Sequence, residues 1–195
     1  MRIFVAGATG VIGSRLVPLL VGAGHVVAGM TRSQEKAADL GTQGAQAVIA
    51  DVFDLDQLRK AVSAFHPELI IHQLTALPDD IARVGEFAAA NARIRREGTD
   101  HLLSAARAAG TTRFIAQSVA WPLEGESGAA VAYLESAVLD FGGTVLRYGQ
   151  LYGPGTFHES APPPPPRIHV EVAATRTLAA LDAPPGILEI SEATR

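Results

Sequence analysis

Short apolar runs rich in β-branched residues alternate along the chain with longer segments of helical periodicity. The apolar runs are nearly continuous, as expected for strands that are buried on both faces of a sheet. They predict strands at residues 2–6, 25–30, 47–50, 69–74, 113–118, 144–148 and 186–190. The segments between them predict helices at residues 11–21, 34–40, 55–64, 80–109, 129–140 and within 169–181. This alternation predicts an α/β fold, a Rossmann-type doubly wound parallel sheet with helices on both faces.

Composition changes near residue 154, where "GPGTFHESAPPPPPR" interrupts the alternation. Five consecutive prolines favour a stiff and exposed polyproline loop, so no regular element is expected there. A length of 195 residues fits one domain with a sizeable core. We therefore interpret residues 1–195 as a single domain that carries a proline-rich loop at 154–167.

Bulk composition narrows the classes of partner. The chain has 48% hydrophobic and 18% charged residues, which is typical of a folded globular protein. A net charge of −4 without a basic cluster argues against a nucleic-acid partner. With no cysteine, disulfides, cysteine nucleophiles and cysteine-ligated metals are excluded, and no metal site is expected. The strand-like start and the lack of a long apolar run indicate a soluble, cytoplasmic protein with no membrane partner.

Three glycines follow the first apolar run, at Gly7, Gly10 and Gly13. In this spacing Gly7 allows a tight turn, Gly10 the close approach of a pyrophosphate, and Gly13 the packing of helix on strand. The helix that follows offers free N–H groups and the positive end of its dipole. The sequence therefore predicts a dinucleotide site in this turn, to which Thr9, Val11 and Ile12 also belong.

The residues after the second predicted strand bear on which dinucleotide is bound. A ribose 2′-hydroxyl calls for an acidic residue there, whereas a 2′-phosphate calls for a cation. The strand ends in "GMTRS", with Thr31 and Arg32 and no acidic residue nearby. Arg15 in the first helix adds a second positive charge, and the planar guanidinium suits phosphate. The sequence therefore favours NADP over NAD.

Several motifs, taken in order, resemble a known family. "GATGVIG" is similar to the glycine motif of extended and atypical short-chain dehydrogenases/reductases, the NAD(P)-dependent epimerase/dehydratase family. "ADVFD" resembles the adenine-contacting aspartate of that family, and "NARIRREGTDHLLSAARAAGTTRFIAQSVAW" its long fourth helix and fifth strand. "LRYGQLYGPGT" and "IHVEVAATRTLAAL" resemble its late segments, so the resemblance covers almost the whole chain.

The resemblance implies roles for particular residues. Cofactor contacts are implied for residues after the third and fourth strands, namely Asp51, Val52, Leu74, Thr75 and Ala76. Ser118 stands at the catalytic serine position, and Tyr148 stands next to the nicotinamide region, both as a further cofactor contact and as a second catalytic candidate. Extended members also carry a larger C-terminal substrate region. We expect the proline-rich loop at 154–167 to replace most of it, leaving a truncated substrate lobe.

The pattern departs from the family at the catalytic tyrosine and lysine. Typical members place a lysine four residues after the tyrosine, where its charge lowers the phenol's pKa. Here Tyr133, the third catalytic candidate, is followed at that distance by Ala137. Registering "LESAVL" on the family helix instead puts the two positions at Ser127 and Val131. The usual pair is therefore absent, and Tyr133 is interpreted as a packed helix residue.

Two functions remain open. The first is an NADP-binding reductase, epimerase or dehydratase that acts on a small organic or sugar-like molecule, with Ser118 donating to the substrate oxygen and a homodimer as the assembled form. The second keeps the fold without redox turnover, as a cofactor-independent cyclase or isomerase or as a non-catalytic nucleotide binder. The missing tyrosine–lysine pair favours the second function, whereas the glycine turn and Arg32 favour the first.

Overall fold

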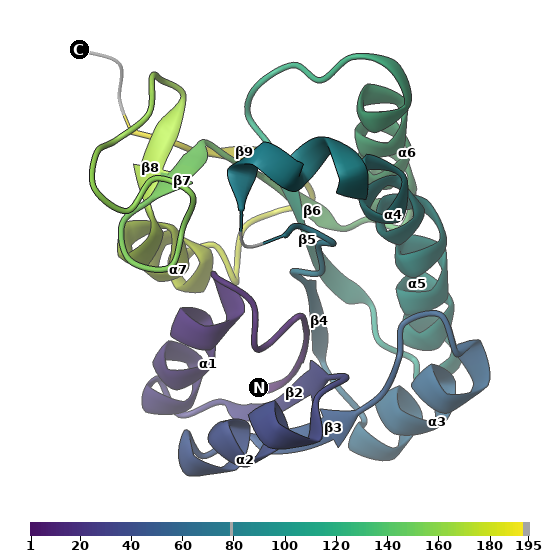
Figure 1. Ribbon diagram of the computed structural model, residues 1–195. Helices are drawn as coiled ribbons and strands as arrows, with labels where there is room; N and C mark the ends of the chain where they lie inside the picture. The colour runs from purple at the N-terminus through teal and green to yellow at the C-terminus, as the bar shows by residue number, and fades with distance from the viewer. Residues whose placement is uncertain (79, 193–195) are drawn as a thin grey trace.

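The computed structural model describes residues 1–78 and 80–192, and a seven-stranded parallel sheet forms its centre (Figure 1). The strands are β1 (Arg2–Ala6), β2 (Val26–Thr31), β3 (Gln46–Ile49), β4 (Leu69–His72), β5 (Arg113–Val119), β6 (Thr144–Tyr148) and β9 (Gly186–Ile190). Their spatial order is β3-β2-β1-β4-β5-β6-β9, and every neighbouring pair is parallel. The order reverses between β1 and β4. This is the doubly wound Rossmann arrangement, so the predicted fold class is confirmed.

Helices cover both faces of the sheet, as Figure 1 shows. The α-helices are α1 (Gly13–Gly22), α2 (Gln34–Thr42), α3 (Leu55–Phe65), α4 (Ala88–Arg93), α5 (Thr99–Ala108), α6 (Gly125–Asp140) and α7 (Val170–Ala179). One apolar core joins the sheet to α1, α2 and α7, and a second joins it to α3, α5 and α6. Alternate residues of one strand feed the two cores: Ile3 and Val5 the first, Phe4 and Ala6 the second.

The prediction of a single helix over residues 80–109 is wrong. The chain instead forms a 3₁₀ helix η1 (Ile81–Phe87), then α4, a π-helical turn η2 (Ile94–Gly98) and α5. No residue of η1 is buried, so no apolar stripe holds this segment in α-helical geometry. Asp80 caps its start by accepting from the Ala82 N–H at 2.9 Å. The π turn is notable because such turns are frequent at functional sites.

Element boundaries also differ from the sequence prediction. The predicted strand 69–74 ends at His72, and the predicted helix 129–140 begins earlier, at Gly125. Gly128 explains the early start. A Cβ at Gly128 would lie 2.1 Å from the Leu123 carbonyl oxygen, so only glycine lets the incoming loop approach the first turn of α6 this closely.

Two short parallel strands, β7 (Gln150–Tyr152) and β8 (Arg167–His169), flank the proline-rich loop. The sequence did not predict this small sheet. Pro163 is buried and its carbonyl accepts from Arg167 Nη1 at 2.9 Å, while the chain bends at residues 164–166. The prolines therefore do not run as one stiff exposed rod. Among residues 1–78 and 80–192, no helix has the length and apolar character needed to cross a bilayer.

Candidate functional site

The glycine turn lies between the C-terminal end of β1 and the start of α1, beside the chain that leaves β4. Gly7 adopts φ 90°, and a Cβ there would lie 2.7 Å from the backbone of Gln73. A Cβ at Gly13 would lie 2.1 Å from the Gly7 carbonyl oxygen, so α1 packs directly on the turn. A Cβ at Gly10 would meet only that same oxygen, at 3.4 Å, and Gly10 is exposed. The open side of the turn is therefore at Gly10.

This open side fits a pyrophosphate. The Ile12 N-cap of α1 offers no side-chain hydrogen bond to the helix start, so no capping side chain competes with a ligand for the backbone N–H groups there. Ile12 itself is buried in the core, whereas Val11 is 40% exposed and Thr9 half-buried. The turn also lies at the reversal of strand order, where open α/β sheets bind their ligands.

Thr31 and Arg32 lie at the end of β2, next to the turn. The buried Thr31 hydroxyl is 3.3 Å from that of Thr9 and accepts from the Ser33 N–H at 3.2 Å. Arg32 is exposed, and within the described residues it forms no hydrogen bond or ion pair. Its charge is therefore available to a ligand. In this respect Arg32 differs from Arg15, the other arginine for which the sequence predicts a cofactor contact.

Arg15 is engaged within the protein. Its Nε donates to Glu171 at 2.7 Å, its Nη1 to the Val11 carbonyl at 2.8 Å, and its Nη2 to the Pro154 carbonyl at 2.5 Å. The side chain is 19% exposed. In this structure Arg15 ties α1 to the C-terminal segment rather than supplying a second free charge beside Arg32.

The remaining nominated cofactor residues lie along the same edge of the sheet. Asp51 accepts from the Phe53 N–H at 2.9 Å, and Val52 is buried with its carbonyl 2.8 Å from His101 Nδ1. After β4, the half-buried residues Leu74, Thr75 and Ala76 run past the glycine turn. Their backbone is fixed because the Leu74 N–H donates to His72 Nδ1 at 3.2 Å and the Ala76 N–H to Asn91 Oδ1 at 3.1 Å.

Ser118 is buried at the end of β5, and its hydroxyl donates to Glu135 Oε1 at 2.5 Å. Arg147 of β6, the register partner of Ser118, donates to the same carboxylate from Nε at 2.9 Å and from Nη2 at 2.5 Å. Burial acts to raise the pKa of Glu135, but the hydrogen bonds from Arg147 and Ser118 outweigh it and hold this pKa below its ordinary value. Ser118 therefore directs its proton to an ionised carboxylate and not to the solvent side.

Neither tyrosine candidate occupies a position suited to proton transfer. Tyr133 is 38% exposed on the outer side of α6 and donates to Asp100 of α5 at 2.8 Å. This hydrogen bond raises the pKa of its phenol. Tyr148 is buried in the first core, where its hydroxyl contacts Thr177 at 2.6 Å and Gln73 at 3.2 Å. Burial raises the pKa of Tyr148 to about 12. Tyr133 is thus an exposed residue of α6 held by α5, whereas Tyr148 is a core residue.

Sequence reasoning overlooked two polar residues at this edge, Glu135 and His72. Glu135 is an acidic residue buried in the middle of α6, and its partner Arg147 is its only ion pair in the part of the chain that the structure describes. His72 is fully buried at the end of β4, and burial, with the charge of Arg95 as a lesser cause, lowers its pKa to about 4. An acidic residue within an apolar helix stripe was the one sequence signal for Glu135. No cluster of metal-ligating side chains occurs among the described residues.

Comparison with known proteins now places this geometry in a family. The family model described as the NAD dependent epimerase/dehydratase family matches residues 3–120, which include the glycine turn and the end of β5. The chain belongs to this family. The resemblance inferred from the motifs is thereby confirmed.

Individual relatives from this comparison are similar to different extents. The 3-diazoavenalumate denitrifying reductase of a Streptomyces species is 43% identical over 180 residues, which cover 80% of this chain and 58% of the relative. The chain thus spans less than two thirds of that protein. An uncharacterised Schizosaccharomyces pombe protein is 43% identical over 94 residues, or 48% of this chain and 30% of the relative.

Among solved structures, the Thermus thermophilus UDP-glucose 4-epimerase in complex with NAD superposes with a TM-score of 0.82 at 20% identity. The match covers 100% of this chain and 78% of the epimerase. The UDP-glucose 4-epimerase of Thermotoga maritima with UDP-glucose gives a TM-score of 0.78 at 20% identity, over 98% and 77% of the two chains. At these identities the likeness establishes the epimerase/dehydratase fold alone.

Proposed function

We propose that this epimerase/dehydratase family member binds NADP in preference to NAD and acts as a reductase on a small organic molecule. The observation that carries the proposal is the glycine turn, whose open side at Gly10 faces the N-terminus of α1. Gly7 to Gly13 would hold the pyrophosphate, and Asp51 with Val52 would border the adenine. The bound cofactor supplies hydride. The similarity to a denitrifying reductase supports reduction over epimerisation or dehydration.

The preference for NADP rests on Arg32. Its exposed guanidinium stands at the end of β2 with no acidic partner among the described residues, which suits a 2′-phosphate and not a free 2′-hydroxyl. Arg15 is left out of this contact because its donors are engaged. The assignment to NADP therefore depends on a single charge.

The proposed reductase works without a tyrosine–lysine pair. Tyr133 is held by Asp100 on the outer side of α6, and Val131 stands at the register position of the lysine. Within the site, Ser118 donates its proton to Glu135, so toward a substrate its oxygen acts as an acceptor and not as the donor that the sequence suggested. We infer that this chain binds and positions its substrate, and that it does not use a phenol to move a proton.

Calorimetric titration with NADPH and NADH tests the cofactor proposal. Gly10→Val should abolish measurable binding of both, because its side chain would fill the open side of the turn. Arg32→Ala should narrow the preference for NADPH by roughly tenfold to a hundredfold, about 1.5–3 kcal/mol. Lys60→Ala, which removes an exposed cation from α3, is the matched control and should leave the preference unchanged. Equal binding of NADPH by wild type and Gly10→Val would overturn the proposal.

Turnover is tested with 3-diazoavenalumate and NADPH, by following the loss of nicotinamide absorbance. Oxidation of NADPH that depends on the diazo compound supports the reductase. The second candidate function, a cofactor-independent isomerase or a nucleotide binder, is favoured by the burial of Tyr148 and the outward position of Tyr133. Tight NADPH binding without oxidation by this or other small acceptors would favour the binder.

We further propose that the protein acts in the cytoplasm as a homodimer. β9 is an edge strand of the sheet and exposes Ile187 and Leu188 on its two opposite faces, so a second copy can pack against this edge. Sedimentation velocity tests this assembly, and a monomer at micromolar concentration would contradict it.

A further inference from the structure

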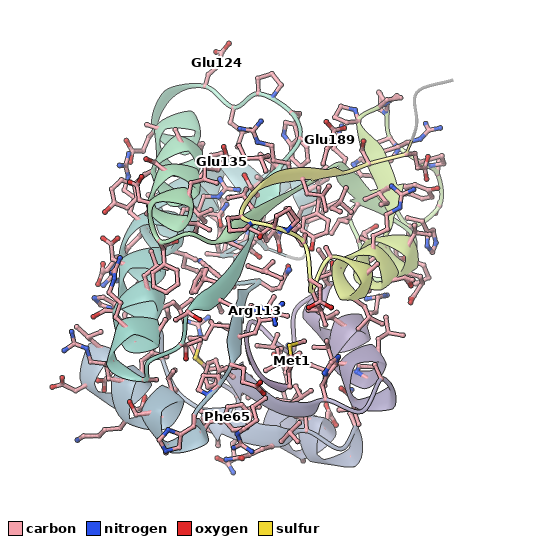
Figure 2. All side chains as sticks on the ribbon, turned by 180° about the vertical axis from the view of Figure 1, so that it is seen from behind. Met1, Phe65, Arg113, Glu124, Glu135 and Glu189 are labelled. Atoms are coloured by element: carbon pink, nitrogen blue, oxygen red, sulfur yellow. The ribbon has the colours of Figure 1, made fainter. Side chains whose placement is uncertain are left out.

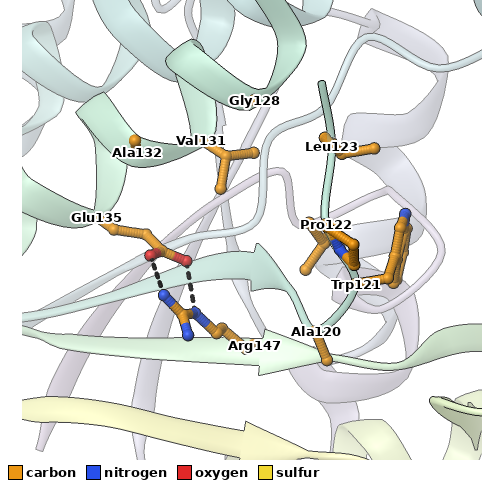
Figure 3. Close-up of a pocket in the computed structure, with 10 residues that line it drawn as sticks. Ala120, Trp121, Pro122, Leu123, Gly128, Val131, Ala132, Glu135 and Arg147 are labelled. Carbon is orange, nitrogen blue, oxygen red and sulfur yellow. Dashed lines mark hydrogen bonds and ion pairs between the residues drawn. The ribbon is translucent and has the colours of Figure 1, made fainter. Parts of the chain in front are cut away.

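A cavity of about 290 Å³ opens between α6 and the loop that follows β5. Figure 3 shows its two walls and the Glu135–Arg147 ion pair beneath α6. The loop wall carries Trp121, Pro122 and Leu123, and the helix wall carries Gly128, Val131 and Ala132. A volume at the lower end of the range for ligand sites suits a single ring rather than a nucleotide sugar.

The walls are apolar and include the one tryptophan of the chain. Aromatic and proline side chains offer flat faces on which a planar ring can stack. The two walls are held close together because a Cβ at Gly128 would lie 2.1 Å from the Leu123 carbonyl oxygen. Figure 3 shows Val131 pointing from α6 into the space between the loop and the ion pair. The shape of the cavity therefore favours a flat ligand.

The floor of the cavity is polar and its hydrogen-bonding capacity is only partly used. Glu135 Oε1 accepts two hydrogen bonds, from Ser118 and from Arg147 Nε, whereas Oε2 accepts one, from Arg147 Nη2. One lone pair of Oε2 remains for a ligand. Arg147 Nη1 makes no hydrogen bond among the described residues, and this side chain is 41% exposed. The floor thus presents one unused acceptor position on Glu135 Oε2, while the N–H groups of Arg147 Nη1 point away from the carboxylate because the pair forms through Nε and Nη2.

The local charge decides which ligand fits this pair of groups. Arg147 is opposed by Glu135 from α6 and by Glu189, its register partner on β9. Figure 2 shows Glu135 and Glu189 toward one end of the sheet and Arg113, at the start of β5, toward the other. Two carboxylates against one guanidinium disfavour an anion. A hydroxyl group can donate to the remaining lone pair of Glu135 Oε2, which an anion cannot do.

We propose that this cavity binds a neutral, hydroxyl-bearing aromatic ring, a phenol, with the ring between Pro122 and Val131, near Trp121, and the hydroxyl donating to Glu135. This site would define the substrate class of the proposed reductase. Only the statement that the phenol is part of the substrate rests on the proposed function. The cavity adjoins Ser118, since Ser118 and the ligand share the Glu135 carboxylate. Occupancy of the cavity itself needs no cofactor.

The single tryptophan makes occupancy measurable without turnover. Phenol, titrated against the full chain, should change Trp121 fluorescence saturably, with a dissociation constant on the order of millimolar for so small a ligand. Anisole has the same ring but no donor, and benzoate carries a negative charge. Both should bind at least about tenfold more weakly than phenol, a loss of about 1.4 kcal/mol.

Variants show whether the cavity is responsible. Val131→Phe should fill the space and weaken phenol binding by tenfold or more, while Leu139→Phe, at an exposed position further along α6, should not. Circular dichroism and thermal melts confirm that both variants fold. Phenol and anisole binding equally would overturn the role of the ion pair. A response without saturation, or one that Val131→Phe leaves intact, would overturn the cavity as the site.

The same titration separates this proposal from the one on cofactor binding. Gly10→Val should lose NADPH and keep phenol, because the glycine turn and the cavity share no residue. If the wild-type chain binds phenol but not NADPH, the proposed function is refuted and the cavity remains a phenol site. If it binds NADPH and turns over substrate but does not bind phenol, the cavity proposal is refuted and the proposed function remains.

Discussion

Replacing Tyr148 by phenylalanine removes one buried hydroxyl and leaves the packing of the ring unchanged. Thr177 uses its own proton on the Ala173 carbonyl at 2.7 Å, so Tyr148 donates to Thr177 and accepts from Gln73. The variant leaves the Gln73 amide N–H buried without an acceptor, next to an Oε1 atom that already has no partner among the described residues. An unsatisfied buried group costs about 1–3 kcal/mol, and we expect Tyr148→Phe to lose that much stability in urea denaturation at neutral pH.

The pH dependence gives a second measurement of the same hydroxyl. The ordinary tyrosine pKa is 10.0, and burial raises that of Tyr148 to about 12 in the folded chain. Between these values the unfolded chain releases the proton and the folded chain keeps it, so wild-type stability falls by about 3 kcal/mol as the pH rises from 10 to 12. Tyr148→Phe lacks this contribution, so its deficit relative to wild type narrows over the same range.

An ultraviolet titration of tyrosinate provides the direct assay. The wild-type curve should contain a last step near pH 12 that is missing from the variant. NADPH affinity should be the same in both proteins, because Tyr148 lies in the core beneath the turn. If Tyr148→Phe kept full stability but lost cofactor binding or turnover, the hydroxyl would belong to the active site and the structural argument would be refuted.

Other predictions concern single groups. Burial, then the nearby positive charge, lowers the His72 pKa from 6.5 to about 4, so wild type should lose about 3 kcal/mol as the pH falls across that interval. Acid denaturation of His72→Gln should lack this loss. Glu135→Ala should lower the free energy of unfolding in urea by about 1–3 kcal/mol, because it removes the acceptor of Ser118 and Arg147. Tyr133→Phe should change stability by no more than about 0.5 kcal/mol. Gly13→Ala should lower the free energy of unfolding by more than about 4 kcal/mol or prevent folding. Gly22→Ala is the control in thermal melts and should be as stable as wild type, because a Cβ there meets nothing within 4 Å.

The elements and the glycine turn could be predicted because their signals are local. Buried strands are apolar throughout, Gly7 takes the positive φ of its own tight turn, and Gly13 packs on the nearby Gly7 carbonyl oxygen. The break in the helix predicted at 80–109 could not be predicted in the same way. Its first third is apolar in composition, but η1 buries none of its residues, and only the folded chain reveals this.

The candidate site was less accessible to sequence reasoning, because burial there depends on distant partners. Tyr148 is on a predicted strand, but its position beneath Gln73 and Thr177 follows from how β4 and α7 pack. Glu135 is tolerated inside α6 because Arg147 reaches it from a strand 12 positions later in the chain. Pattern alone shows neither the partner nor the direction of the Ser118 hydroxyl.

The Arg15 guanidinium has a consequence for the affinity of the site. It bonds the Val11 carbonyl in the glycine turn, Glu171 on α7, and the Pro154 carbonyl at the start of the proline-rich loop, 139 residues away. The shape of the turn and the order of that loop are therefore thermodynamically linked, and linkage is reciprocal. We therefore expect a substitution that removes the contact at Pro154 to change dinucleotide affinity without touching any contact to the ligand.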